Sequence, residues 1–266
     1  MTAASGTLAL VLSLSAITLF SCGNTKKSQP PAEEKKPASA PAPDVSYFKV
    51  DPATAGSISG TIRFAGARPR PKLIDMSEDP ACVEAHHTKA YDESLVVGRT
   101  GKLANVFLYV KSGLEGKHFE IPQTPVAIDQ KGCWFRPRIL GIQVGQPLQV
   151  LNSDPVTHNI HPRAEVNREW NHSQGPGDPP ITRKFLKPEI MIPVKCNIHS
   201  WMHAFIGVVD SPYFAVSDED GTFKIGNLPP GDYVIEAWHE LLGTQEQRIT
   251  VAPSQSAAVN LTFRRK

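Results

Sequence analysis

The sequence predicts an all-β protein built from two β-sandwiches. Short runs of alternating side chains, rich in β-branched and aromatic residues, recur from residue 45 to residue 266. Gly, Pro, Asn and Asp separate these runs, as they do at turns between strands. No long amphipathic helical pattern interrupts them. Because this segment is longer than one small sandwich needs, we expect two.

The expected strands are short and follow one another along the folded part. Alternate side chains of a strand face opposite sides of its sheet, so each run can bury one face. The strands are expected at residues 57–64, 105–110, 139–144, 148–151, 205–209, 222–225 and 233–237. The segment 69–95 is less regular, and we expect a small helix around residues 80–87.

Residues 1–22 have the pattern of an export signal. The apolar run from Leu8 to Phe20 is shorter than the roughly 20 residues that a membrane-spanning helix needs. Ser21 and Cys22 follow it and resemble a lipobox, in which Cys22 becomes the lipidated first residue of the mature protein. No Lys or Arg precedes the run, so a cleaved signal peptide and an uncleaved anchor stay as alternatives. Each predicts an exported protein, in the periplasm or as a lipoprotein of the outer membrane or cell surface.

Residues 23–44 are predicted to form a disordered linker. They are rich in Pro and Ala and contain almost no large apolar side chains, so they cannot offset the entropy cost of ordering. Such a stretch is typical of a semi-extended tether between an anchor and a folded domain.

Charge and motif content exclude several classes of function. The net charge of +2 is too small to indicate a surface for nucleic acid. No Ser-His-Asp set, paired carboxylates or phosphate-binding Gly loop stands out, so nothing indicates hydrolytic or nucleotide chemistry. We therefore expect a protein that is not an enzyme and has no nucleic-acid partner.

The number of cysteines indicates how they are used. With Cys22 assigned to the signal, an odd set of three remains, which needs an explanation in an oxidising compartment. A disulfide between Cys82 and Cys133 leaves Cys196 as the lone thiol, which a metal ion would protect as thiolate. The alternative for Cys82 is a second metal site shared with the histidines at 86–87.

The lone cysteine lies in the most informative motif of the chain, Cys196-Asn-Ile-His199-Ser-Trp-Met202. His158-Asn159 lies upstream, on what we expect to be a neighbouring loop. Two imidazoles, one thiolate and a weak axial thioether are the ligands of a blue-copper electron-transfer site. Structural zinc sites prefer several thiolates or paired histidines without a thioether. His203, directly after Met202, is the alternative axial ligand.

The residues around this motif resemble small cupredoxins. The resemblance rests on Phe135-Arg-Pro137, Ile142-Gln-Val-Gly145 and Val150-Leu-Asn152-Ser-Asp, which precede the first histidine. The two-residue gap before the methionine is similar to the short ligand loop of amicyanins, and the whole resembles bacterial methylamine-utilisation-type proteins. The resemblance implies a Greek-key sandwich over residues 119–211.

The same resemblance implies one type 1 copper ion. His158, Cys196 and His199 would form its trigonal plane, and Met202 would be the axial ligand. Asn159 would hydrogen-bond across to the cysteine loop. If His203 replaced the methionine, the site would resemble the red-copper centre of nitrosocyanins.

The C-terminal part has a second signature. Asp218-Glu-Asp-Gly221 predicts a hairpin turn with Gly at the position that requires positive φ, and Asn227-Leu-Pro-Pro-Gly231 predicts another turn. With the strands that follow, this pattern resembles the carboxypeptidase-regulatory-like, transthyretin-like sandwich domain. The opening strands of that family match residues 56–64 and 105–110. The resemblance implies a smaller, discontinuous domain, 55–118 and 212–266, interrupted by the copper domain; a tandem arrangement is the alternative.

Together these features predict an exported, lipid-anchored blue copper protein that acts in one-electron transfer. Its partners are expected to be redox proteins, with the membrane reached through the lipid anchor. A copper-binding and delivery protein is one alternative function. A surface interaction module with a structural metal site is another.

Overall fold

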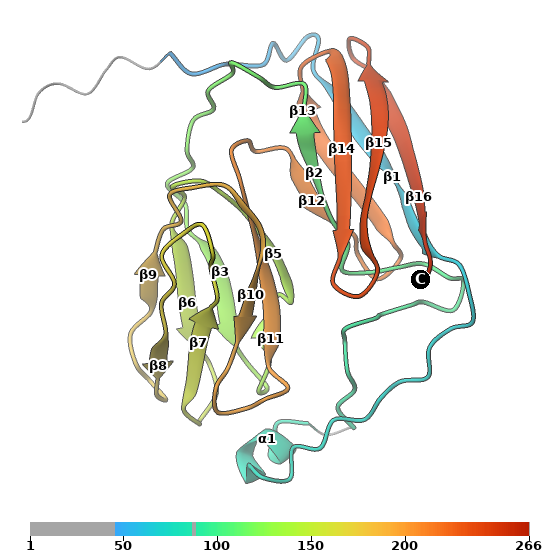
Figure 1. The fold of residues 1–266 in the computed structure, drawn as a ribbon. Coiled ribbons are helices and arrows are strands. Elements are labelled where there is room, and N and C mark those ends of the chain that lie inside the picture. The colour runs from blue at the N-terminus through green and yellow to red at the C-terminus, as the bar shows by residue number, and fades with distance from the viewer. Residues whose placement is uncertain (1–45, 87–88, 266) are drawn as a thin grey trace, which may run out of the picture. The chain divides into compact units, whose positions relative to one another are not determined.

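The computed structural model describes residues 46–86 and 89–265. Within these ranges the chain is nearly all β, which confirms the predicted fold class (Figure 1). The predicted export signal, Cys22 and the linker lie outside the described residues. In the described part of the chain, no helix is long and apolar enough to cross a membrane.

One pair of sheets, here called the terminal sandwich, combines strands from both ends of the described chain. Its three-stranded sheet has the order β13-β1-β16, and its four-stranded sheet has the order β12-β2-β14-β15. β1 runs parallel to β16 and antiparallel to β13. The strands are β1 (Gly56–Phe64), β2 (Phe107–Ser112), β12 (Phe214–Val216), β13 (Thr222–Leu228), β14 (Gly231–His239), β15 (Gly243–Val251) and β16 (Ser256–Phe263).

The second pair of sheets, the central sandwich, lies between β2 and β12 in the sequence. Its sheets have the orders β5-β11-β10-β7-β8 and β4-β3-β6-β9. The bounds of the two predicted domains stay a prediction. The strands are β3 (Val126–Gln130), β4 (Phe135–Arg136), β5 (Ile139–Gln143), β6 (Leu148–Asn152), β7 (His158–Pro162), β8 (His172–Gln174), β9 (Ile181–Arg183), β10 (Glu189–Lys195) and β11 (His203–Val209).

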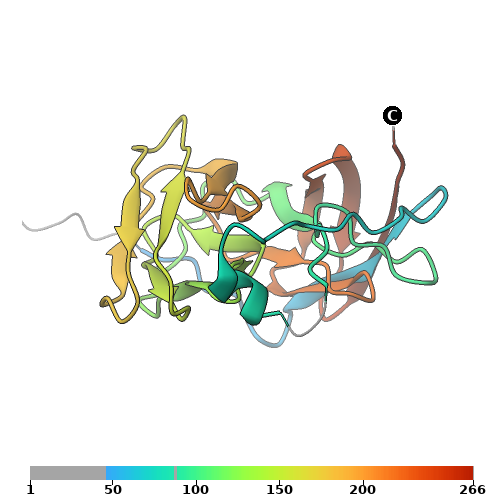
Figure 2. The ribbon, with the colours of Figure 1, turned by 90° about the horizontal axis from the view of Figure 1, so that it is seen from below.

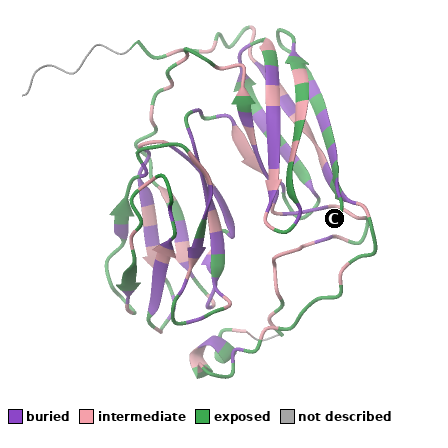
Figure 3. Cartoon of the chain, in the orientation of Figure 1, coloured by how far each residue is buried: buried purple, intermediate pink, exposed green. Residues whose placement is uncertain are grey.

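Period-two burial explains why these segments form strands. Along β16 every second residue is buried, from Ala257 to Phe263, and the bands alternate in Figure 3. The inward side chains of the terminal sandwich form one apolar core with Ile58 and Ile235 among its fully buried members. The central sandwich has its own core, which includes Ile128, Ile192 and Cys196.

The predicted turn at residues 218–221 forms, but it does not make a hairpin. Gly221 has φ +66°, and its N–H donates to the Asp218 carbonyl at 2.9 Å. The strands on either side, β12 and β13, belong to different sheets of the terminal sandwich. The turn therefore carries the chain from one sheet to the other, and the hairpin prediction is wrong.

A single helical turn, α1 (Pro80–Glu84), lies in the segment between β1 and β2 (Figure 2). Asp79 is its N-cap: Oδ1 accepts hydrogen bonds from Ala81 N at 3.0 Å and Cys82 N at 3.4 Å. Pro80 occupies the first helical position, where its missing N–H costs nothing. The helix is shorter than the sequence predicts, and its N-cap Asp79 and its Cys82 both lie beside the ring of His199.

Candidate metal centre

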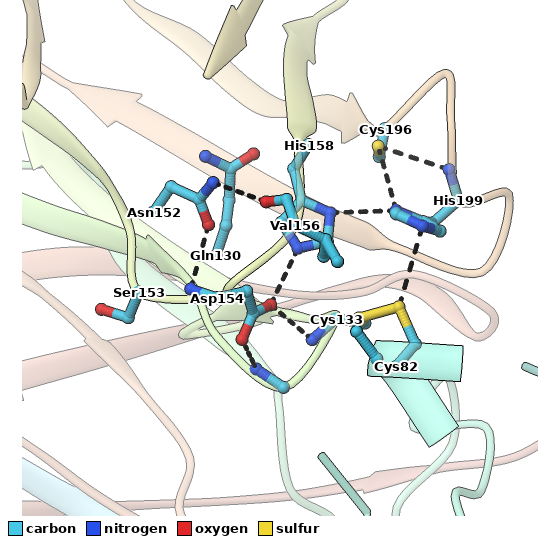
Figure 4. A network of polar contacts seen from close by, with 12 residues as sticks. Cys82, Gln130, Cys133, Asn152, Ser153, Asp154, Val156, His158, Cys196 and His199 are labelled. Carbon is cyan, nitrogen blue, oxygen red and sulfur yellow. Dashed lines mark hydrogen bonds and ion pairs between the residues drawn. A yellow bond between two sulfur atoms is a disulfide. The ribbon is translucent and has the colours of Figure 1, made fainter. Parts of the chain in front are cut away.

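Three predicted metal ligands converge where strands of the central sandwich end. His158 is the first residue of β7, and Cys196 and His199 belong to the loop between β10 and β11, residues 196–202, here called the ligand loop. β7 pairs antiparallel with the end of β10, which brings its start beside this loop. One ligand atom from each of the three residues lies within 4.8 Å of the others, and all three residues are buried (Figure 4).

The sulfur of Cys196 lies among hydrogen-bond donors. The backbone N–H groups of Asn159, Ile198 and His199 each donate to Sγ at 3.4 Å. Burial raises the pKa of the thiol, but the interaction with His158 and these three N–H groups outweighs it and lowers the pKa to about 6. Cys196 is therefore a thiolate at neutral pH, the form that binds metal. Among the described residues it is the only cysteine outside a disulfide.

The two histidine rings face each other through the same type of nitrogen. Nδ1 of His158 lies 2.9 Å from Nδ1 of His199, and Nδ1 of His199 lies 4.0 Å from Sγ of Cys196. Burial lowers the pKa of His158, but hydrogen bonds and charges from Asp154 and Cys196 outweigh it and raise the pKa to about 9. One proton held between the two Nδ1 atoms satisfies this geometry.

Asp154 supports the far side of the His158 ring. Its Oδ2 accepts from His158 Nε2 at 2.8 Å and from Cys133 N at 2.7 Å, and its Oδ1 accepts from Gly132 N at 2.6 Å (Figure 4). Burial raises the pKa of this carboxyl, but the hydrogen bonds and the charge of His158 prevail and lower it. Asp154 is therefore ionised and holds the ring in place.

Asp79 and a disulfide cover the far side of the His199 ring. Oδ2 of Asp79 accepts from His199 Nε2 at 3.0 Å. Cys82, in α1, is bonded to Cys133, and its Sγ lies 3.7 Å from the same Nε2. His199 is only 3% exposed as a result.

The other residues around Cys82 do not form the second metal site that the sequence left open. The sulfur of Cys82 is engaged in the disulfide, so it offers no thiolate. Nε2 of His86 hydrogen-bonds to the Gly132 carbonyl at 2.7 Å. His87 lies outside the described residues.

The two candidates for the axial ligand differ in burial. Met202 is fully buried and belongs to the same apolar core as Cys196. His203, the first residue of β11, is exposed. The backbone of Met202 also closes the ligand loop, because Cys196 N donates to its carbonyl at 3.2 Å and its own N–H donates to His199 O at 3.0 Å. The burial pattern favours Met202 over His203.

Asn159 links the two segments that supply the ligands. Its side-chain oxygen accepts a hydrogen bond from the backbone N–H of Asn197 in the ligand loop. Its own N–H donates to Sγ of Cys196, and its Nδ2 donates to the side chain of Asn171. This buried residue thus joins β7 to the ligand loop, which is the contact that the resemblance to cupredoxins implies.

Sequence reasoning did not identify Asp79 or Asp154 as part of the site. Asp154 lies four residues before His158, within the Asn152-Ser-Asp corner, and that proximity is a signal that could have pointed to it. Asp79 has only the signature of an N-cap before Pro80. No sequence pattern indicates that it reaches a ring 120 positions away.

The donor set fits copper. One thiolate and two imidazole nitrogens meet beside a buried thioether, and soft sulfur ligands with imidazole suit copper in a trigonal site with a weak axial contact. The common structural zinc sites contain at least two thiolates. A single free thiolate thus favours copper over structural zinc.

Comparisons with known proteins give one family match and several similar solved structures. No curated protein sequence matches it. A copper-containing nitrite reductase from Thermus scotoductus is 21% identical over 38% of this chain and 26% of its own, with a TM-score of 0.31. A mutant of amicyanin in its oxidised form is 16% identical over 38% of this chain and 97% of its own, with a TM-score of 0.29. A purple cupredoxin from Nitrosopumilus maritimus is 21% identical over 31% of this chain and 98% of its own, with a TM-score of 0.27.

A family model matches the C-terminal part of the chain. The match covers residues 203–264, which run from β11 through β16. It thus includes the last strand of the central sandwich and most strands of the terminal sandwich. The described structure of this part is all β, as the predicted resemblance requires. Residues 203–264 therefore match the carboxypeptidase regulatory-like domain family, and the solved structures similar to this chain include cupredoxins.

Proposed function

We propose that the protein binds one copper ion and acts in one-electron transfer. His158, Cys196 and His199 would hold the ion, with Met202 as the axial ligand. The observation that carries the proposal is the buried convergence of one thiolate and two Nδ1 atoms. Copper bound there would supply a change between two oxidation states.

The chain's own residues prepare the site for that change. Three backbone N–H groups and the His158 ring stabilise the thiolate, and Asp154 and Asp79 orient the two rings. All three ligands are almost completely shielded from water. A rigid and dry ligand set reduces the reorganisation that accompanies a change of charge. Among the described residues the shielding also leaves little room for a substrate beside the ligands, and we therefore favour a carrier over an enzyme.

We further propose that the protein is exported and anchored by a lipid on Cys22. The signal pattern of residues 1–22 supports this. The Cys82–Cys133 disulfide adds support, because disulfides form and persist mainly in oxidising compartments outside the cytoplasm. Metabolic labelling with a fatty acid tests the anchor, and Cys22→Ser must abolish the label.

The function is tested by loading the purified protein with copper and cycling it between oxidation states. Electron transfer predicts one bound ion, reversible cycling and retention of Cu(I) against a chelator. Rapid loss of Cu(I) to the chelator would instead indicate copper delivery. No uptake of copper would contradict both, and a structural interaction module would then be the better account.

A further inference from the structure

We propose that Asp79 and Asp154 are positioning residues of the metal centre, each held against one of its two histidines by the disulfide Cys82–Cys133. The proposal rests on the proposed function, since it takes His158 and His199 as metal ligands. It assigns to the disulfide a role in the centre itself, in addition to any role in stability.

Each carboxylate fixes which nitrogen of its histidine carries hydrogen. Asp154 accepts from Nε2 of His158 at 2.8 Å, and Asp79 accepts from Nε2 of His199 at 3.0 Å. An ionised carboxylate can only accept, so both rings must be protonated at Nε2. The two Nδ1 atoms then face each other, with one proton between them, on the side of the cluster that holds Cys196. A metal-bound histidine typically has such a partner on its other nitrogen, which raises its basicity as a ligand.

The two carboxylates come from distant parts of the chain, and the disulfide joins them. Asp79 caps α1, and Cys82 follows within that helical turn, so the disulfide holds the cap in place. At the other end, Cys133 donates its backbone N–H to Asp154 at 2.7 Å. One covalent bond therefore anchors the acceptors of both rings.

A further contact ties this bond to the ligand loop. Nε1 of Trp201 donates to the Cys133 carbonyl at 3.1 Å, and the Trp201 ring packs against His199, with centroids 5.1 Å apart and the planes tilted by 44°. The disulfide sulfur of Cys82 is itself 3.7 Å from His199 Nε2. The His199 ring is thus enclosed by Asp79, the disulfide and Trp201, all connected through Cys133.

Asp79 has a second role as N-cap, and the test must separate the two. Oδ1 caps α1, whereas Oδ2 contacts His199. Serine is as good an N-cap as aspartate, but its side chain is too short to reach the ring. Asp79→Ser therefore keeps the helix cap and removes the contact with His199. Asp75→Ser is the matched control, because Asp75 lies in the same segment and hydrogen-bonds to Ser77 instead of to a histidine of the centre.

The experiment compares the full-length protein with Asp79→Ser and Asp75→Ser. Loss of an outer partner of a metal-binding histidine typically weakens metal affinity by about 10–100-fold. We expect Asp79→Ser to show this loss of Cu(I) affinity, measured by competition with a chelator, and Asp75→Ser to show none. We also expect a higher reduction potential in Asp79→Ser, since a negative charge that favours Cu(II) has been removed. In protein without copper, ¹⁵N NMR should show the Nε2–H form of His199 giving way to a mixture.

Cys82→Ala/Cys133→Ala tests the disulfide. We expect it to weaken Cu(I) binding in the same direction, and we expect Asp79→Ser to add little in that background. If Asp79→Ser weakened Cu(I) binding by the same factor with and without the disulfide, the proposed role of the disulfide would be wrong. Unchanged affinity, potential and ring tautomer in Asp79→Ser would overturn the positioning role. If the unaltered protein binds no copper, the proposed function fails, while the NMR result still tests how Asp79 orients the ring.

Discussion

Nδ1 of His158 and Nδ1 of His199 lie 2.9 Å apart, a distance at which the N–H of one ring donates a hydrogen bond to the nitrogen of the other. Both nitrogens are the expected metal donors, and a metal needs both lone pairs. Metal binding must therefore displace the proton between them. This relationship makes metal affinity depend on pH in a defined way.

The first prediction concerns that pH dependence. The pKa of His158 is raised to about 9, and the pKa of Cys196 is lowered to about 6. Between these values His158 in the protein without metal still holds the proton between the two Nδ1 atoms and Cys196 is a thiolate, so binding releases one proton. Affinity for Cu(I) should rise about tenfold per pH unit from pH 6 to pH 9, and about twice as steeply on a logarithmic scale below pH 6. Chelator competition measures it, and a flat profile from pH 6 to pH 9 would contradict the proton between the rings.

The second prediction isolates the thiolate. In protein without metal, ultraviolet absorption of the thiolate should titrate with a midpoint near pH 6, far below the ordinary value of 9.0 for a cysteine. Cys196→Ser must remove the transition, because the other described cysteines form a disulfide. A midpoint near 9 would mean that His158 and the backbone N–H groups do not stabilise the charge.

The third prediction separates the axial candidates. Met202→Leu preserves volume in a fully buried position, so the fold should lose less than about 1.5 kcal/mol. Copper should stay bound with a shifted reduction potential, because the thioether is a weak axial ligand. His203→Ala is the matched control, and we expect it to leave potential and spectrum unchanged because that side chain is exposed. The reverse pattern would assign the axial position to His203.

The fourth prediction concerns a buried ion pair away from the centre. Nε and Nη2 of Arg138 donate to the two carboxylate oxygens of Glu240 at 2.7 and 2.8 Å, and both side chains are less than a tenth exposed. Glu240→Ala leaves the guanidinium buried without its partner and should cost about 3–5 kcal/mol of unfolding free energy. Glu246→Ala, which removes an exposed partner of Lys111, is the control and should have a much smaller effect. Thermal or denaturant unfolding measures both losses. If the two variants lost equal unfolding free energy, the prediction that burial makes the Arg138–Glu240 pair more costly to break would be wrong.

The sequence predicts most of the strands because apolar and polar residues alternate along them, as the burial of every second residue requires. The expected strand at residues 148–151 is β6 almost residue for residue. The strand expected at 105–110 starts two residues later, as β2. Asn105 has φ +61°, a conformation outside a strand, and Val106 N donates to a Ser217 side chain instead of a neighbouring strand. Local geometry of this kind is not visible in an alternating pattern.

The ligand motif was predictable because its residues are close in sequence, whereas their supports were not. Cys196, His199 and Met202 lie within seven positions on one loop. Asp79 reaches the centre from an irregular segment between β1 and β2, where no periodic pattern indicates the path of the chain. Only the folded structure shows that Cys82, three residues after Asp79, brings this segment to His199.

We infer that Cys196, with His158 and His199, holds a copper ion in a blue-copper site. The most direct measurement is the visible absorption and electron paramagnetic resonance of the copper-loaded protein and its Cys196→Ser variant. We predict an intense thiolate-to-copper band with small parallel hyperfine splitting in the unaltered protein, and loss of both features in the variant. An unchanged spectrum in Cys196→Ser would show that Cys196 is not a copper ligand.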